Sequence, residues 1–196
     1  MKTMLSLVTS LVLLGNMAFA QVKWTVDPAH SNVRFEVNHL GISVIDGEFS
    51  KLAGAVESKD STQFNQAKIS FEIDVNSINT RIAARDKHLK NDDFFNAEQF
   101  PKITLTDAVL TATKKGEFTL KGNLTIRDIT KPVVFKVKQN NGVITDPWGK
   151  KRAGFTASTS INRMDYNIKY NDKLPNGVEA VASEVKIIVN TELVKN

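Results

Sequence analysis

Most of the chain beyond residue 21 alternates apolar and polar residues with a period of two. The alternation is clearest over residues 33–37, 69–75, 118–126, 133–137, 153–159 and 185–189. A period of two gives each segment one dry face and one wet face, which is typical of half-buried antiparallel strands. The pattern predicts an all-β fold of about eight strands, closed into a barrel or packed as a sandwich.

Gly and Pro residues mark turns between these segments. The turn sequences lie at residues 27–28, 46–47, 115–116, 131–132, 141–142, 146–147 and 175–177. No linker, repeat or low-complexity tract divides the sequence, so we expect a single domain over residues 21–196.

Residues 80–90 depart from the alternation and follow a helical period instead. Ile78, Ile82 and Leu89 recur at helical spacing, and the side chain of Thr80 is suited to cap the first turn. A basic strip beside this apolar face consists of Arg81, Arg85 and His88. The aromatic-rich connection that follows contains Phe94, Phe95 and Phe100. We expect the short helix and this connection to cover one end of the barrel.

The first 20 residues have the features of a secretory signal peptide. Lys2 precedes an apolar run over residues 4–14, and Ala18 and Ala20 form an A-x-A cleavage site. The run is too short to span a bilayer. We therefore expect cleavage after Ala20 and a periplasmic or secreted product that begins at Gln21.

The charge balance argues against nucleic acid as a partner. The chain has 26 Lys and Arg residues against 21 Asp and Glu residues, and the excess is spread along the sequence rather than gathered into a basic stripe. Weak attraction to an anionic membrane surface stays open, and so does the pairing of two barrels into a homodimer.

The interior of such a barrel is either filled by its own side chains or holds one small ligand. The small residues expected to face inward are Gly47, Ala53, Gly54, Gly122, Ala153, Gly154 and Ala157. The aromatic residues expected there are Phe35, Phe49, Phe71, Phe118, Phe135 and Phe155. This mixture is compatible with tight interdigitation and with an elongated tunnel, and periodicity alone leaves both open.

Two histidines near predicted strand ends raise the question of a metal site. His30 and His39 could bind a metal together with Asp27 or Asp46, or each could form a hydrogen bond with the backbone at a barrel end. The sequence has no HxH, no HExxH and no Cys, which favours the structural role. We therefore predict no metal and no cofactor.

The remaining basic residues have a functional and a structural interpretation. The basic strip on the predicted helix could hold the polar head of a ligand, such as a phosphate, or could be a solvated face. Arg127 and Arg163 are expected to form salt bridges with Asp128 or Asp165. The motifs of serine hydrolases, P-loop proteins and dinucleotide-binding enzymes do not occur, so we predict no catalytic residue.

Sequence blocks along the chain resemble one known family. The opening block reads WTVDPAHS at residues 24–31, and the last reads INRMD at residues 161–165. Further blocks lie at residues 35–39, 47–49, 77–80, 85–89, 93–95, 100–101, 122–127, 130–132 and 154–155. Taken in order, they are similar to the YceI-like, polyisoprenoid-binding proteins over nearly all of residues 22–190. One departure is Asn167, which stands where the family usually has Gly; because Asn accepts a positive φ better than most residues, we expect the turn to form.

The resemblance implies a lipocalin-like, eight-stranded antiparallel barrel that binds and carries or stores a long lipid in an apolar tunnel. It implies an isoprenoid ligand, either a quinone or a polyprenyl precursor, and an exported protein. The implied tunnel lining is Phe35, Val37, Phe49, Phe71, Ile73, Phe94, Phe95, Leu105, Phe118, Leu120, Leu124, Phe135 and Phe155. Head-group contacts are expected from Arg81, Arg85 and His88. A lipid-modifying enzyme with the same pocket and a secreted interaction module without ligand stay as alternatives.

Overall fold

The computed structural model describes residues 21–196, and the signal peptide predicted for residues 1–20 lies outside that range. The strands in chain order are β1 (Val22–Val26), β2 (Asn32–His39), β3 (Ser43–Phe49), β4 (Leu52–Ser58), β5 (Ala67–Asp74), β6 (Ile78–Asn79), β7 (Lys102–Lys114), β8 (Glu117–Ile126), β9 (Ile129–Thr145), β10 (Lys151–Asn162) and β11 (Val181–Lys195). One helix, α1 (Ala83–Leu89), and two 3-10 turns, η1 (Val75–Ser77) and η2 (Arg163–Tyr166), complete the described elements. None of the helices within residues 21–196 has the length and apolar character needed to cross a membrane.

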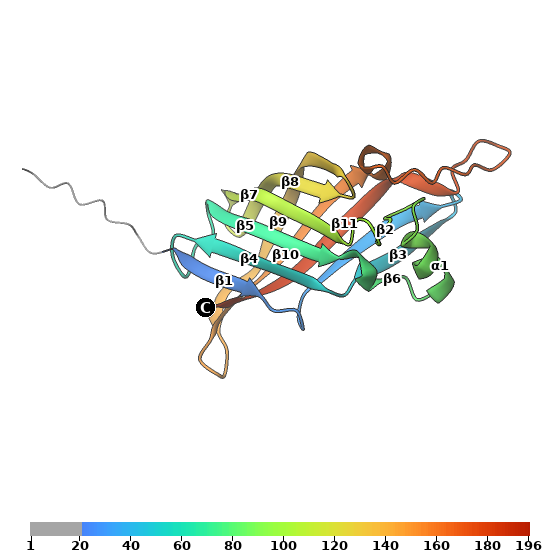
Figure 1. Cartoon of the computed structure of the whole chain (residues 1–196). Helices are drawn as coiled ribbons and strands as arrows, with labels where there is room; N and C mark the ends of the chain where they lie inside the picture. The colour runs from blue at the N-terminus through green and yellow to red at the C-terminus, as the bar shows by residue number, and fades with distance from the viewer. Residues whose placement is uncertain (1–20) are drawn as a thin grey trace, which may run out of the picture.

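The strands close into one antiparallel barrel (Figure 1). Hydrogen bonds link β1, β4, β5, β7, β8, β9, β10 and β11 in that order, and β1 pairs with β11 to complete the ring. β1 and β2 are two parts of one bent strand, and β2 pairs with the first part of β11. β3 and β4 likewise form one bent strand, and β3 pairs with β2. The barrel therefore has eight strands, three of which bend and carry two labels each, and the predicted eight-stranded barrel is confirmed.

The bends follow from local sequence. The chain turns between β1 and β2 at Asp27-Pro28, where the proline has no N–H to donate and the Asp27 carboxylate accepts the Ala29 N–H at 3.0 Å. The chain turns again after β5, where the Asp74 carboxylate accepts the Asn76 N–H at 2.9 Å and caps η1. Because of this second bend, β6 pairs with β3 and with no other strand among the described residues. The gap that results between β6 and β7 is filled by α1 and residues 90–101.

Three of the predicted turns are wrong. Asp46 and Gly47 lie inside β3, paired with β2. Pro132 lies inside β9 opposite Asn123, and the turn between β8 and β9 falls at residues 127–128, where Arg127 has a φ of 54°. Asn141 and Gly142 also lie inside β9, with φ values of 64° and 72°, where the register with β10 shifts. Positive φ values at consecutive residues build a bulge as readily as a hairpin turn, so the Asn-Gly pair bends the strand without ending it.

The helix is shorter than predicted and lacks the predicted apolar face. It begins at Ala83, because Ile78 lies in β6 and Arg81 has a φ of 68°, which no α-helix accommodates. Thr80 does not cap it, since its hydroxyl donates to the Asp86 carboxylate. Ile82 is 51% exposed, whereas Leu89 is half-buried and packs against the core.

One end of the barrel is closed by aromatic side chains. Trp24 and Phe64 are fully buried, with their ring centroids 5.1 Å apart, and Phe64 packs edge-on against Phe155 at 4.9 Å. The Trp24 indole N–H donates to the Ser58 hydroxyl at 3.0 Å, so its polar atom is satisfied inside the core. This plug makes the barrel interior blind at one end.

Both ends of the described chain lie at this closed end. The Asn196 N–H donates to the Lys23 carbonyl at 3.0 Å, next to the start of β1. α1 and the connection before β11 lie at the opposite end (Figure 1). Any opening into the barrel is therefore on the side away from both termini.

Candidate ligand cavity

The barrel interior is hollow. A central cavity of about 140 Å³ lies within it, and a deeper chamber of about 60 Å³ lies toward the Trp24 end. The two share Phe71, Leu105, Phe135 and Val189, which form the neck between them. Both walls are almost entirely apolar. Of the two interiors compatible with the sequence, the structure therefore has the hollow one and not the tightly filled one.

A third chamber, the mouth, opens beside α1. It has a volume of about 380 Å³ and shares five residues with the central cavity: Phe35, Val37, Leu89, Phe94 and Val181. It shares none with the deep chamber, so the central cavity lies between the two. The polar side chains of the mouth are His39, Thr80, Arg85, His88 and Tyr170. The chambers therefore run from a partly polar mouth to an apolar blind end.

Two phenylalanine–glycine pairs keep the interior open. Phe35 lies directly opposite Gly47, and Phe71 lies directly opposite Gly54, each pair in adjacent antiparallel strands. A Cβ atom on Gly47 would lie 2.4 Å from Phe35 Cζ, and one on Gly54 would lie 2.1 Å from Phe71 Cδ1. Each ring thus occupies the place of its partner's missing side chain against the barrel wall. Space that these rings would otherwise fill is left empty.

The structure places most of the predicted lining residues on a cavity wall. Those on the central cavity are Phe35, Val37, Phe49, Phe71, Ile73, Phe94, Phe95, Leu105, Leu124 and Phe135. Leu120 and Phe155 line the deep chamber. Phe118 lines neither, because it lies at the start of β8, beyond the deep chamber, with its ring centroid 6.4 Å from that of Phe155. Ala53, expected inside, is exposed, and Gly154 faces Asn140 rather than the interior.

The prediction missed several aliphatic residues of the wall. Val185, Ile187 and Val189 of β11 line the central cavity, as do Ile103 of β7 and Ile126 of β8. The alternation over residues 185–189 already places those three side chains on one face, so the signal was present.

Arg163 is a buried cation in the wall of the central cavity that the sequence did not indicate. It is 3% exposed, and its guanidinium donates to the backbone carbonyls of Ala182 at 3.0 Å, Ile168 at 2.9 Å and Val181 at 2.8 Å. The predicted bridge to Asp165 is wrong, since that carboxylate pairs with a lysine of β9. Burial lowers the pKa of Arg163. The side chain ties η2 to the start of β11 beside the mouth.

Arg127 plays a similar part at the aromatic connection. It donates to the carbonyls of Asp92 at 2.7 Å, Phe94 at 2.9 Å and Asn167 at 2.8 Å, and its guanidinium lies 5.6 Å from the Phe100 ring centroid. These contacts fasten the aromatic connection to the turn between β8 and β9. The aromatic residues of the connection therefore pack against the barrel end as expected.

The turn at Asn167 forms although Gly is absent. Asn167 has a φ of 58° and closes η2, and its side-chain amide donates to both oxygens of Asp128 at 3.0 Å. That bond lowers the pKa of Asp128. Asp128 is thus held by Asn167, so the predicted pairing of Arg127 with Asp128 is wrong.

The predicted basic strip does not exist as one surface. Arg81 turns away from the mouth and pairs with Asp46 at 2.6 Å, because its backbone is not helical. This ion pair lowers the pKa of Asp46. Arg81 lies outside the mouth lining, whereas Arg85 and His88 are part of it.

Arg85 and His88 are each fixed by a local partner. Arg85 donates to the hydroxyl of Thr80 at 2.8 Å and to its carbonyl at 2.7 Å. His88 forms a hydrogen bond with Asp93 at 2.9 Å, which lowers the pKa of that carboxylate. The His88 ring also packs edge-on against Phe94, with ring centroids 5.1 Å apart. Both side chains thus present a polar edge to an apolar opening.

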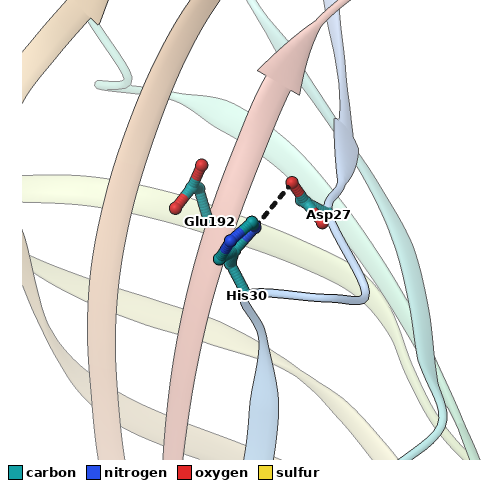
Figure 2. A group of neighbouring side chains, drawn as sticks. All are labelled: Asp27, His30 and Glu192. Carbon is teal, nitrogen blue, oxygen red and sulfur yellow. Dashed lines mark hydrogen bonds and ion pairs between the residues drawn. The ribbon is translucent and has the colours of Figure 1, made fainter. Parts of the chain in front are cut away.

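A separate polar cluster lies at the bend between β1 and β2. Figure 2 shows His30 between Asp27, on the same bend, and Glu192, on β11. Their potential metal-ligating atoms lie within 4.8 Å of one another. However, Arg152 donates to Asp27 at 2.8 Å, to Asp146 at 2.7 Å and to Glu192, so a guanidinium already supplies the positive charge. The geometry is that of an ion-pair clamp over the bend.

The charges in this clamp reinforce one another. Hydrogen bonds from His30 and then Arg152 lower the pKa of Asp27 to about 2. The same bond to Asp27 raises the pKa of His30. A hydrogen bond to the backbone was predicted for His30; this is wrong, because its ring is bound to the Asp27 carboxylate. His39 lies on the mouth wall.

Two sets of known proteins are similar in sequence to this chain. The UPF0312 protein of Shewanella baltica (strain OS155) is 34% identical over 170 residues, covering 86% of this chain and 88% of that protein. Protein YceI of Salmonella arizonae is 35% identical over 180 residues, covering 91% and 88%. These matches extend over the whole barrel.

Solved structures share the fold. BcnA of Burkholderia cenocepacia superposes with a TM-score of 0.69 at 21% identity, over 85% of this chain and 98% of that one. A polyisoprenoid-binding domain from Saccharophagus degradans gives 0.62 at 14% identity, over 88% and 98%. Residues 24–193, from the start of the closed end to the last strand, match the YceI-like domain. With the sequence relatives and the barrel in agreement, the chain belongs to the YceI-like family.

Proposed function

We propose that this protein binds one long apolar lipid, an isoprenoid such as a quinone or a polyprenyl precursor, inside the barrel and carries or stores it. The observation that supports this most directly is the apolar, blind-ended run of chambers behind a partly polar mouth. The neighbour from Saccharophagus degradans, described as a polyisoprenoid-binding domain, lends support from a protein with the same fold.

Burial alone supplies enough affinity. Each methylene removed from water is worth roughly 0.8 kcal/mol before the cost of ordering the chain. A ligand of about 30 heavy atoms at about −0.3 kcal/mol per atom reaches roughly −9 kcal/mol, which is a sub-micromolar Kd. No covalent bond to the protein is required.

The polarity gradient sets the orientation of the ligand. Trp24 and Phe64 plug the far end, so a polar head group there would lose its hydration without gaining a partner. Arg85 and His88 lie at the mouth, where a head group keeps contact with water. We place the head group at these two residues and the tail along the central and deep chambers.

We also propose that binding is not followed by chemistry and that the protein acts after export. Among residues 21–196, the walls of the central and deep chambers contain no carboxylate, histidine, serine or cysteine, so a nucleophile and its base do not meet there. The sequence of residues 1–20 supports export to the periplasm or beyond.

A matched pair of variants on β11 tests the proposal. Ile187 lines the central cavity, whereas its neighbour Ile188 does not. Ile187→Phe should fill the lumen and weaken binding of a prenyl quinone by about tenfold or more, while Ile188→Phe should leave it unchanged. Fluorescence titration of delipidated protein measures the affinity, and mass spectrometry of solvent extracts identifies any lipid that co-purifies. Absence of co-purified lipid together with no uptake of prenyl quinone would refute the proposal, and conversion of the ligand during incubation would refute its non-catalytic part.

A further inference from the structure

The central cavity and the deep chamber meet at the neck. Phe71 of β5, Leu105 of β7, Phe135 of β9 and Val189 of β11 surround it, and each of them lines both spaces. A tail that enters the deep chamber has to pass between these four side chains.

The position of the Phe71 ring depends on Gly54. The ring lies over Gly54, where a Cβ atom would come within 2.1 Å of Phe71 Cδ1 and 2.6 Å of Cε1. The same Cβ atom would also lie 2.8 Å from the Ser70 carbonyl oxygen, which belongs to the strand backbone and moves less readily than the ring. A side chain at position 54 would therefore displace the ring toward the neck. The absence of that side chain holds the passage open.

We propose that the Gly54–Phe71 pair determines the longest isoprenoid tail that the protein binds well. This inference rests on the proposed function and adds the rule by which ligands are distinguished. A short tail ends in the central cavity and does not use the neck. A long tail gains the burial of its last units in the deep chamber, whose far wall is closed by Phe64 and Phe155. Narrowing the neck should remove that gain and nothing else.

The second phenylalanine–glycine pair provides an internal comparison. A Cβ atom on Gly47 would press on Phe35 and on Thr80 Cγ2, at 2.8 Å, and both residues line the mouth. A change there affects the entry of every ligand. Of these two glycines, Gly54 is the one placed to separate long tails from short ones.

The test compares Gly54→Ala with Gly154→Ala. Gly154 is also a strand glycine, but the nearest atom to its added Cβ is 3.7 Å away and it lines no cavity, so its variant should bind like the unmodified protein. Binding of a short prenyl alcohol, geranylgeraniol, and a long one, solanesol, is measured by competition with a fluorescent lipid. Gly54→Ala should weaken solanesol binding by about tenfold and change geranylgeraniol binding by less than about twofold.

Two further variants keep the test decisive if Gly54→Ala folds poorly. Gly54→Ala combined with Phe71→Ala removes the displaced ring and should restore solanesol binding. Ala157→Phe fills the deep chamber from β10, since Ala157 lines that chamber and not the central cavity, and should reproduce the selective loss. An equal loss for both alcohols, or no loss for either, overturns the length rule while the proposed function stands. If the unmodified protein binds neither alcohol, the length rule and the isoprenoid function fall together.

Discussion

At the scale of single residues, two buried or clamped arginines organise the barrel ends. Arg163 gives its donors to three backbone carbonyls instead of to a carboxylate. Arg152 gathers three carboxylates around the bend between β1 and β2. A guanidinium suits both tasks because its donors are fixed in a planar fork.

Replacing Arg163 with Met should destabilise the protein. The substitution removes the donor from three carbonyls, one buried and two partly buried, and at about 1 kcal/mol for each hydrogen bond the free energy of unfolding falls by about 3 kcal/mol. The midpoint of thermal unfolding should fall by roughly 10 °C. The unfolding temperature of Arg163→Lys, which retains a donor, should lie between those of the parent protein and the Met variant. A Met variant as stable as the parent protein would contradict this role of Arg163.

His30 should make stability depend on pH in one direction. Because its folded-state pKa is raised above the ordinary value of 6.5, its contribution is complete below that value and is lost as the pH rises through the folded-state pKa. Asp27 stays ionised over this range, since its pKa is about 2. Unfolding temperatures of the parent protein and His30→Gln should therefore differ more at about pH 5 than at about pH 9. If the difference in unfolding temperature instead grew toward high pH, protonated His30 would not be the stabilising form.

Residue partners were the hardest feature to predict from the sequence. Most acceptors of Arg127 and Arg163 are backbone carbonyls, several of them far along the chain, and no spacing rule marks a carbonyl as an acceptor. The one carboxylate that Arg127 does pair with, at 2.8 Å, is that of Asp92, 35 residues away. Nearby aspartates looked like natural partners, but one is held by Asn167 and the other by a lysine. By contrast, the inward direction of Phe35 and Phe71 followed directly from strand alternation.

At the scale of elements, the alternation identified strands well and their ends poorly. β8 and β10 cover the predicted segments, and β5 covers all of its segment except Val75, which begins η1. β9 runs for 17 residues through a proline and an Asn-Gly pair that were expected to end it. A proline or an Asn-Gly pair does not end a strand when the neighbouring strand can accommodate a missing N–H or a bulge. Whether it can is decided by the tertiary pairing of the strands, which the local sequence does not show.

Helix α1 should be the least stable element near the tunnel. It has no buried residue, and it fills a gap where no strand ladder forms. Its amides should therefore exchange with solvent at least about a hundredfold faster than those of β8, which is paired on both sides. Hydrogen exchange followed by mass spectrometry measures both.

Lipid binding should slow exchange in α1 because Leu89 lines the central cavity and the mouth. β8, already protected, serves as the internal reference. Protection of α1 equal to that of β8 in the lipid-free protein would show that the helix is a fixed wall and not a movable cover.

At the scale of the whole molecule, the sequence predicted the strand number and the cover at one end, but the blind end was beyond its reach. Closure depends on β1 meeting both β4 and β11, which is a long-range pairing. The plug depends on Phe64, a loop residue with no periodic signal, which packs between Trp24 and Phe155. Hollowness itself depends on which glycines face which rings, and this requires the strand register.

The shared location of the two ends of the described range, residues 21–196, bears on how the protein can be attached to a label or a surface. Asn196 pairs with the backbone of Lys23 at the plugged pole of the barrel. An affinity handle, a fluorescent reporter or a solid support joined to either terminus is therefore held at the pole opposite α1. Fusions of this kind should leave ligand exchange undisturbed, whereas a graft into the loop between β2 and β3 would stand beside the entrance.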